Sequence, residues 1–183
     1  MKFIKTKISD LIIIEPTAFG DARGYFLESY NKKKFEKIIG KTSFVQDNES
    51  KSSRGVLRGL HFQKPPFDQA KLVRCVQGRV LDVAVDVRKG SITYLEYVKV
   101  ELSEENKRQL FIPRGFAHGF IVLSESAVFA YKVDNVYAPK YDAGIKWNDK
   151  ELNIDWGINP NQVLVSEKDS NLPYLTDFKS PFY

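Results

Sequence analysis

The amino-acid sequence predicts an all-β domain of the jelly-roll kind with a few short helices. Short β-branched or aromatic runs recur along most of the chain, turn residues separate them at similar intervals, and only one segment has clear helical spacing. Many short strands joined by turns are typical of a β-sandwich or barrel. Because 183 residues match the size of one domain, we expect residues 1–183 to form a single domain.

The N-terminal quarter combines short strands with the one predicted helix. Residues 30–39 carry Phe35, Ile38 and Ile39 at helical spacing and are followed by Gly40, a common helix stop. The runs around this helix are β-branched or aromatic and are bounded by turn residues or proline. We expect strands at residues 11–14, 25–30 and 42–47, a turn at residues 21–24, and a polar loop at residues 49–53.

The middle of the chain holds the clearest strands. Residues 71–77 and 79–87 flank Gly78, and valines at positions 83, 85 and 87 alternate with two aspartates and an alanine. Alternation with a period of two predicts one apolar face and one polar face. A strand that carries His61 is expected within residues 56–63, and further strands are expected at residues 97–102, 109–112, 120–123 and 128–134. From Tyr137 onward the sequence predicts ordered loops and one short helical turn.

The net charge of +5 indicates an anionic partner, which could be nucleic acid, a membrane surface or a small phosphorylated molecule. The basic residues are scattered, and the one run, at residues 32–34, falls in the predicted helix, where a solvated face explains it. The longest apolar runs are far shorter than the roughly 18 residues that cross a bilayer. We therefore expect no nucleic-acid partner and no membrane partner.

Cysteine content and the N-terminal residues predict a reducing compartment. Cys75 is the only cysteine and cannot form an intrachain disulfide, and the first ten residues lack the apolar run of a signal peptide. We expect a cytoplasmic protein. Cys75 lies in an apolar predicted strand, where a buried thiol is its ordinary role, so we do not expect it to act as a nucleophile.

The stretch at residues 56–63 holds His61, one of only two histidines, and places Arg58 three residues before it. A histidine can accept and return a proton near neutral pH, and an arginine is suited to bind a phosphate. On a regular strand these two side chains point to opposite faces, unless Gly59 between them marks a bulge. A structural role for His61 is the competing interpretation.

A metal centre is the first alternative to test, because catalytic sites of this kind need about three ligands from His, Asp, Glu or Cys. His61 and His118 are far apart in sequence, and neither has a second histidine two to five residues away. We therefore expect no metal site.

Acid and base chemistry remains, with three further candidates. Tyr131 offers an aromatic hydroxyl, Asp169 could orient an imidazole, and Lys71 begins a strand from which an ammonium could face a cavity. Each has an ordinary structural explanation: a core aromatic, the fourth position of a helix capping box, and an exposed lysine. Taken singly, none of them establishes a site.

The chain nevertheless resembles the dTDP-4-dehydrorhamnose 3,5-epimerase family along nearly its whole length. The resemblance rests on a long ordered set of short segments. These are residues 19–24, 44–48, 56–63, 71–75, 82–88, 106–110, 112–120, 131–132 and 147–149.

This resemblance implies a cupin-like jelly roll without metal that acts on a dTDP-linked 4-keto-6-deoxy sugar. It implies that His61 is the base that removes protons beside the ketone and that Asp169 is paired with it. Tyr131 is implied as the acid on the other ring face and Lys71 as the group set against the ketone oxygen. An enolate needs a base, a cation near oxygen and a second proton source, so these roles are chemically consistent.

The resemblance also implies the residues that bind the substrate. Tyr137 matches an aromatic that stacks on thymine, and Asp142 stands where family members often have glutamate, which puts that one contact in doubt. The other implied contacts are Arg23, Glu28, Gln46, Asn48, Arg58, His118 and Lys168.

No cofactor is expected, because deprotonation and reprotonation leave the oxidation level unchanged and the chain has no G-x-G-x-x-G motif. A homodimer is expected, partly from the resemblance and partly because the N-terminal strands leave sheet edges that must be covered. Two alternatives remain open: a single-carbon epimerase or ketoisomerase of the same fold, and a non-catalytic carbohydrate-binding jelly roll.

Overall fold

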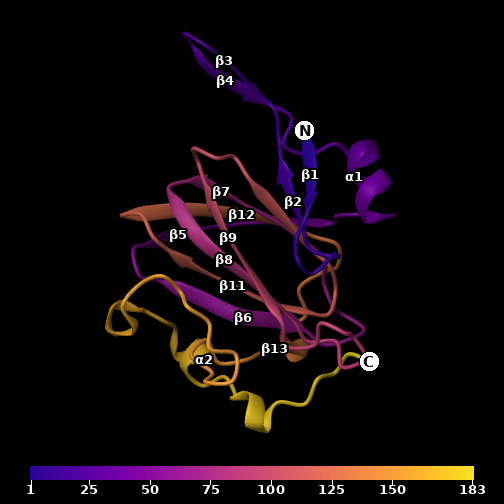
Figure 1. The fold of residues 1–183 in the computed structure, drawn as a ribbon, viewed down its shortest axis with the longest axis vertical. Coiled ribbons are helices and arrows are strands. Elements are labelled where there is room, and N and C mark those ends of the chain that lie inside the picture. The colour runs from indigo at the N-terminus through magenta and orange to yellow at the C-terminus, as the bar shows by residue number, and fades with distance from the viewer.

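The computed structural model describes residues 1–183 as two β-sheets packed face to face, with a small hairpin projecting from one end (Figure 1). All pairings between neighbouring strands are antiparallel. This arrangement confirms the predicted all-β class and its sandwich architecture.

The first sheet has six strands in the order β1-β2-β10-β7-β12-β5, and the second has five in the order β13-β6-β11-β8-β9. The strands of the first sheet are β1 (Lys2–Lys5), β2 (Ile12–Glu15), β10 (Gln109–Ile112), β7 (Lys71–Gln77), β12 (Ser126–Val133) and β5 (Gln46–Ser53). Those of the second are β13 (Asp142–Gly144), β6 (Leu57–Gln63), β11 (Phe116–Val122), β8 (Arg79–Asp86) and β9 (Tyr97–Ser103). The projecting hairpin pairs β3 (Ala18–Asp21) with β4 (Gly24–Leu27).

The helices are few and short. α1 (Lys32–Ile39) begins after Asn31, whose side chain accepts a hydrogen bond from the Lys34 N–H, and ends at Gly40. The others are α2 (Glu167–Ser170) and three single 3₁₀ turns, η1 (Pro139–Tyr141), η2 (Pro160–Gln162) and η3 (Leu175–Asp177). None of these helices has the length and apolar character that a membrane crossing requires.

Three clusters of buried apolar side chains hold the layers together. The interior cluster lies between the two sheets and includes Val73, Leu110 and Phe129. A second cluster joins the outer face of the five-stranded sheet to residues 145–183, which we call the C-terminal strap and which contributes Trp156. A third places Phe35 of α1 against the outer face of the six-stranded sheet. The strap covers the lower part of the molecule in Figure 1.

Two predictions about the region before His61 were wrong. Residues 42–45 are not a strand, and residues 49–53, predicted as a polar loop, belong to strand β5, which pairs along its whole length with β12. On β5 every second side chain, from Gln46 to Ser52, is partly or fully buried, although all of them are polar. Gln46, Asn48 and Ser50 line a cavity rather than an apolar core, so the usual strand pattern is missing.

Smaller differences concern the ends of elements. The strand predicted at residues 25–30 ends at Leu27, and the helix begins at Lys32 because Asn31 caps it. The strand predicted from residue 120 begins at Phe116, so it includes His118 and Gly119. These positions decide which side chains point into the space between the sheets.

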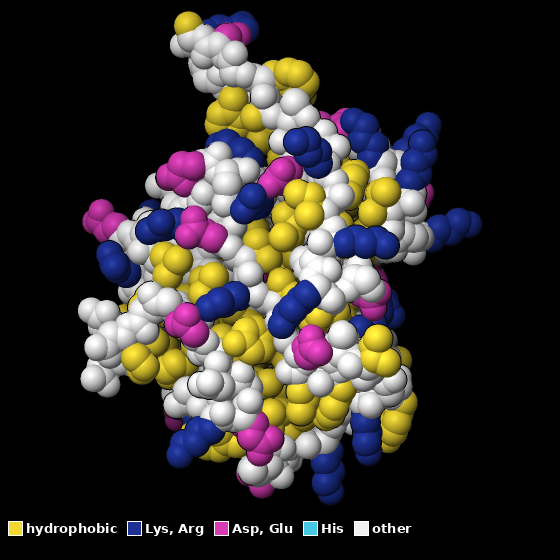
Figure 2. Space-filling view, in the orientation of Figure 1, with side chains coloured by type: hydrophobic (Ala, Val, Ile, Leu, Met, Phe, Trp, Pro, Cys, Tyr) yellow, Lys and Arg dark blue, Asp and Glu magenta, His cyan; other side chains and the backbone are white.

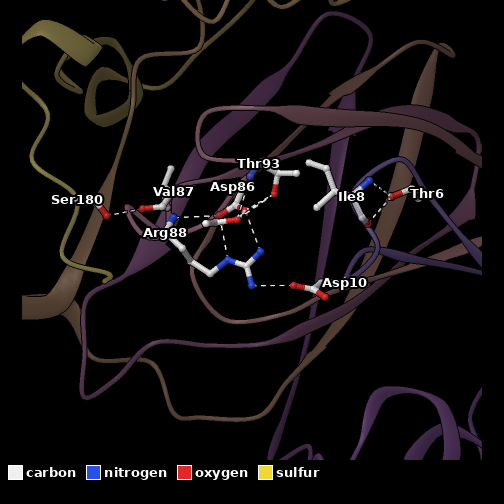
Figure 3. Close-up of polar contacts among 9 residues, drawn as sticks. Thr6, Ile8, Asp10, Asp86, Val87, Arg88, Thr93 and Ser180 are labelled. Carbon is white, nitrogen blue, oxygen red and sulfur yellow. Dashed lines mark hydrogen bonds and ion pairs between the residues drawn. The ribbon is translucent and has the colours of Figure 1, made fainter.

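A polar network fastens the end of β8 to a loop near the N-terminus (Figure 3). The fully buried Asp86 carboxylate accepts hydrogen bonds from Arg88, from the Ser91 hydroxyl at 2.6 Å and from the Thr93 hydroxyl at 2.7 Å. Burial works to raise the pKa of Asp86, but these donors outweigh it and hold the pKa below its usual value. Arg88 also pairs with Asp10 at 2.8 Å, so one guanidinium joins two distant segments.

Candidate active site

A cavity between the two sheets contains most of the candidate residues. It has two adjoining lobes with volumes of about 520 Å³ and about 320 Å³. Both lobes are lined by the same four side chains, namely His61, Lys71, Tyr131 and Lys168. We treat them as one site, with a first lobe that also holds Arg58, His118 and Asp169 and a second that also holds Gln46, Asn48, Tyr137 and Asp142.

His61 and Asp169 form a close pair at the wall of the first lobe. Nε2 of His61 lies 2.6 Å from Oδ1 of Asp169, and Oδ2 accepts a hydrogen bond of 3.2 Å from the Gly59 N–H. The Asp169 side chain is 4% exposed, whereas that of His61 is 27% exposed. Burial works to raise the pKa of Asp169, but the bond to His61, its charge and the Gly59 N–H bring the pKa below its usual value. An ionised Asp169 therefore holds the proton of His61 on Nε2 and leaves Nδ1 free to act as a base.

Asp169 reaches this position because it lies in the first turn of α2. The Ser166 hydroxyl caps that helix by accepting a hydrogen bond from the Asp169 N–H. The backbone of Asp169 thus serves the cap while its side chain binds His61. The structural interpretation of this residue is confirmed, and the cap leaves its carboxylate free to pair with His61.

Gly59 makes it possible for Arg58 and His61 to line the same lobe. On β11 the partners of these residues, Phe120 and His118, are two positions apart, so β6 carries one extra residue. Gly59 has φ +137°, and a Cβ there would lie 2.5 Å from Cα of Gly119. The bulge that the sequence suggested is confirmed, and only glycine fits it.

Lys71 and Tyr131 face His61 from the other sheet, since they lie on β7 and β12. Lys71 has no hydrogen-bond or ion-pair partner in the chain. Burial lowers the pKa of its ammonium to about 8, although the negative charges of Asp82 and Asp142 act to raise it. Burial raises the pKa of Tyr131, which keeps its hydroxyl protonated and able to donate. The cavity therefore has a base on one wall and a cation and a proton donor on the other.

Asp82 lies behind the site, where it contacts His118 without lining either lobe, and the sequence prediction did not include it. It is fully buried on β8, and its Oδ2 lies 2.8 Å from Nε2 of His118, while Oδ1 is buried without a hydrogen-bond partner. Burial lowers the pKa of His118 despite the nearby Asp82. Alternating valines and aspartates suggested a strand with one solvated face, but that polar face points into the space between the sheets.

The remaining predicted contacts divide into two groups. The Tyr137 hydroxyl donates to Oδ2 of Asp142 at 3.1 Å, and the Lys168 ammonium pairs with the same carboxylate. By contrast, Arg23 and Glu28 line neither lobe: Arg23 is 90% exposed and bonds Asp21, and Glu28 pairs with Lys34. One chain alone does not bring these two residues to the site.

Two other candidate chemistries find little support in the arrangement of side chains. No group of three or more His, Cys, Asp or Glu side chains is placed to hold a metal ion. Cys75 is buried, its thiol donates to the Gln77 carbonyl, and burial raises its pKa to about 12, so it is a poor nucleophile.

Comparison with known proteins identifies close relatives. The family model described as dTDP-4-dehydrorhamnose 3,5-epimerase matches residues 5–177. The curated dTDP-4-dehydrorhamnose 3,5-epimerase of Shigella flexneri is 58% identical over 173 residues, which cover 93% of this chain and 94% of that protein. The crystal structure of dTDP-4-dehydrorhamnose 3,5-epimerase from Elizabethkingia anophelis NUHP1 is 57% identical with a TM-score of 0.93, covering 97% of each chain.

Two further structures bear on the substrate. A dTDP-6-deoxy-D-glucose-3,5-epimerase from Legionella pneumophila Philadelphia 1, in complex with dTDP-4-keto-L-rhamnose, is 48% identical with a TM-score of 0.95 and covers 100% of this chain and 98% of that chain. A 3'-monoepimerase from Streptomyces bikiniensis is 32% identical with a TM-score of 0.86 and covers 94% of this chain and 87% of that chain. The similarity is therefore higher to enzymes that act at two carbons.

Proposed function

The chain belongs to the dTDP-4-dehydrorhamnose 3,5-epimerase family, and from this premise we propose which of its side chains carry the reaction. The reaction inverts carbons 3 and 5 of dTDP-4-dehydro-6-deoxy-D-glucose and gives dTDP-4-dehydro-L-rhamnose. The observation that carries the proposal is the His61–Asp169 pair, which faces Lys71 and Tyr131 across one cavity. The reaction leaves the oxidation level unchanged, so its chemistry needs no redox cofactor.

His61 is the base that removes the proton from each carbon beside the 4-keto group. Its Nδ1 is the available nitrogen, because Nε2 is bound to Asp169. As the imidazole takes up a proton it becomes a cation, and the adjacent ionised carboxylate stabilises that charge. Asp169 therefore orients the ring and lies beside the charge that the imidazole gains during the reaction.

Lys71 stabilises the negative charge that develops on the ketone oxygen. A carbon-bound proton is acidic only when the negative charge of the enolate is stabilised. A cation stabilises that charge more strongly in a site shielded from water, because the dielectric constant is lower there. The buried Asp82 lies close enough to raise the pKa of Lys71, opposing the effect of burial. We propose that the Asp82–His118 pair helps to keep Lys71 charged at neutral pH.

Tyr131 returns a proton to the opposite face of the sugar ring. It lies on the sheet that faces His61, so a sugar between the sheets has the base on one side and the phenol on the other. Removal from one face followed by delivery to the other inverts the carbon. If His61 removes a proton and returns it to the same face, the configuration of the carbon does not change.

Side chains from both lobes bind the nucleotide. Arg58 has no carboxylate partner and bonds only the Ser52 hydroxyl, at 3.1 Å, which leaves guanidinium N–H groups for a phosphate. Tyr137 is 55% exposed, so its ring is free to stack on the base. Gln46, Asn48, His118, Asp142 and Lys168 complete the proposed contacts.

Hydrogen exchange tests this function directly. We expect incubation with the dTDP-linked 4-keto-6-deoxyglucose in deuterated water to place deuterium at both carbon 3 and carbon 5, as measured by NMR or mass spectrometry. Exchange at one carbon alone identifies a monoepimerase, and exchange at neither identifies a binding module. The higher identity to the 3,5-epimerases than to the 3'-monoepimerase supports the first outcome.

We also propose a homodimer in which the β3–β4 hairpin reaches the partner's cavity. The hairpin projects from the body of the molecule (Figures 1 and 2). Its three aromatic residues, Phe19, Tyr25 and Phe26, are each at least 59% exposed. An isolated two-stranded hairpin is at best marginally stable in water, so such a surface favours burial against another chain. The hairpin region carries Arg23 and Glu28, the two predicted contacts that one chain leaves outside the site.

Mixing two inactive variants tests the shared site. Arg23→Ala and His61→Ala chains should each have little activity alone, and subunit exchange between them should form some sites that contain both intact residues. We expect activity to return in the mixture, measured by epimer formation, with unmixed variants as controls. A monomer by light scattering, or proven exchange without recovered activity, contradicts the shared site.

We propose the cytoplasm as the working compartment. The chain has a single cysteine, Cys75, which is buried, so the fold does not depend on an intrachain disulfide. Cell fractionation followed by immunodetection measures the location directly, and recovery of the protein outside the cytoplasmic fraction contradicts this proposal.

A further inference from the structure

Gln63 is a buried amide in the wall of the second lobe that the mechanism above does not use. It lies two residues after His61 on β6, so both side chains point to the same face of the sheet. The residue is 4% exposed and lines the lobe beside Tyr137. A buried side-chain amide is costly unless its donors and acceptor are bonded, so its partners indicate what it stabilises.

The partners of Gln63 lie on both sides of Tyr137. Its Nε2 donates to the Val136 carbonyl at 3.1 Å and to the Phe67 carbonyl at 2.6 Å, and its Oε1 accepts from the Ala138 N–H at 2.6 Å. The amide therefore holds the residue before Tyr137 and the residue after it. It ties both to the strand that carries the proposed base.

Tyr137 itself has few other anchors. Its ring is more than half exposed, its hydroxyl bonds Asp142, and its N–H makes only a long contact of 3.4 Å with Oε1 of Gln46. Without Gln63, three backbone groups lose their bonds and the segment loses its fixed position. A ligand would then have to order this segment when it binds, which lowers affinity.

We propose that Gln63 is a positioning residue that holds residues 136–138 so that the Tyr137 ring is ready to receive the nucleobase. This inference rests on the proposed stacking role of Tyr137. All three hydrogen bonds of Gln63 go to backbone groups, so we assign it no direct contact with the reacting carbons or the base. Its loss should therefore weaken nucleotide binding and raise KM, while kcat at saturating substrate changes little.

A double-mutant cycle tests whether Gln63 acts through Tyr137. The variants are Gln63→Met, which keeps the size but removes the hydrogen bonds, Tyr137→Ala, and the two combined. We expect each single variant to weaken dTDP binding by about tenfold, which corresponds to about 1.4 kcal/mol. The double variant should bind no more than about twofold weaker than Tyr137→Ala, because neighbours that act as one unit are not additive. Inorganic pyrophosphate, which lacks the base, should bind all four proteins alike.

Thr93→Val is the matched control for general loss of stability. It is an isosteric change that removes a hydrogen bond to Asp86, in the network of Figure 3. It should lower the unfolding temperature without changing the Kd for dTDP. If Gln63→Met does not fold, Gln63→Glu replaces it, because glutamate keeps the shape and one acceptor but loses both donors.

The outcomes separate this inference from the proposed function. If Tyr137→Ala binds dTDP more weakly than the wild type, three results overturn this inference and leave the proposed function intact. They are fully additive effects of the two substitutions, an equal loss of pyrophosphate binding, and unchanged dTDP affinity in Gln63→Met. Unchanged dTDP affinity in Tyr137→Ala overturns the stacking role and with it this inference.

Discussion

Replacing His61 by alanine is expected to lower kcat by about 100- to 10,000-fold, the range typical for loss of a general base. The Kd for dTDP should stay within about threefold of the wild-type value, because binding comes mainly from phosphate and base contacts at Arg58, Lys168 and Tyr137. The measurements are steady-state epimerisation and calorimetry with dTDP. A variant that keeps more than about a tenth of wild-type turnover contradicts the assignment of His61 as the base.

Asp169→Asn provides the companion variant for this test. It keeps the size of the side chain but removes the negative charge beside His61. We expect a smaller loss of kcat than in His61→Ala. Asp169 also accepts a hydrogen bond from the Gly59 N–H, so the substitution could disturb the bulge at Gly59. An unchanged unfolding temperature would show that the fold is intact.

Replacing Lys71 by methionine is expected to have the second-largest effect, a loss of about 100- to 1,000-fold in kcat, by analogy with removal of one group that stabilises an oxyanion. Burial lowers the pKa of Lys71 to about 8, and in the proposed mechanism the charged form is the active one. The fraction of charged Lys71 falls as pH rises through this value. The wild-type kcat/KM should therefore decline above about pH 8, and the decline should be absent in Lys71→Met.

Asp82→Asn tests the source of that pH dependence. The Asp82 charge raises the pKa of Lys71, so its removal should move the alkaline decline of kcat/KM to lower pH. The total charge of the cavity changes by one unit, but no proposed contact to the substrate is lost. An alkaline decline that is identical in wild type, Lys71→Met and Asp82→Asn assigns it to another group and contradicts the role given to Lys71.

The sequence predicted the strands that have an apolar face, because their pattern follows directly from burial. Strands β7 and β8 appear almost at their predicted bounds. Strand β5 did not follow the pattern, since its inward side chains border the cavity and are polar from Gln46 to Ser52. Elements that line a polar site are the ones for which the hydrophobic pattern fails.

The residues of the candidate site could likewise be predicted from the sequence only where the signal is local. Gly59 between Arg58 and His61 indicated a bulge by itself, because a glycine inside a strand pattern is a local signal. The partner of His61 lies 108 positions away, and no local pattern indicates such a contact. The sequence by itself offered Asp169 only as one candidate among several, and the family resemblance paired it with His61. Asp82 was missed because alternation alone does not distinguish a face in water from one turned into a cavity.

The path of the C-terminal strap determines the order in which the active site is completed during synthesis. Every strand of both sheets lies before residue 145, whereas Asp169 follows on the strap. A growing chain can therefore pair all its strands while His61 still lacks the carboxylate that fixes its proton. The two sheets can therefore form before the His61–Asp169 pair, so the proposed active site is complete only after the strap has been synthesised and has packed against the sheets.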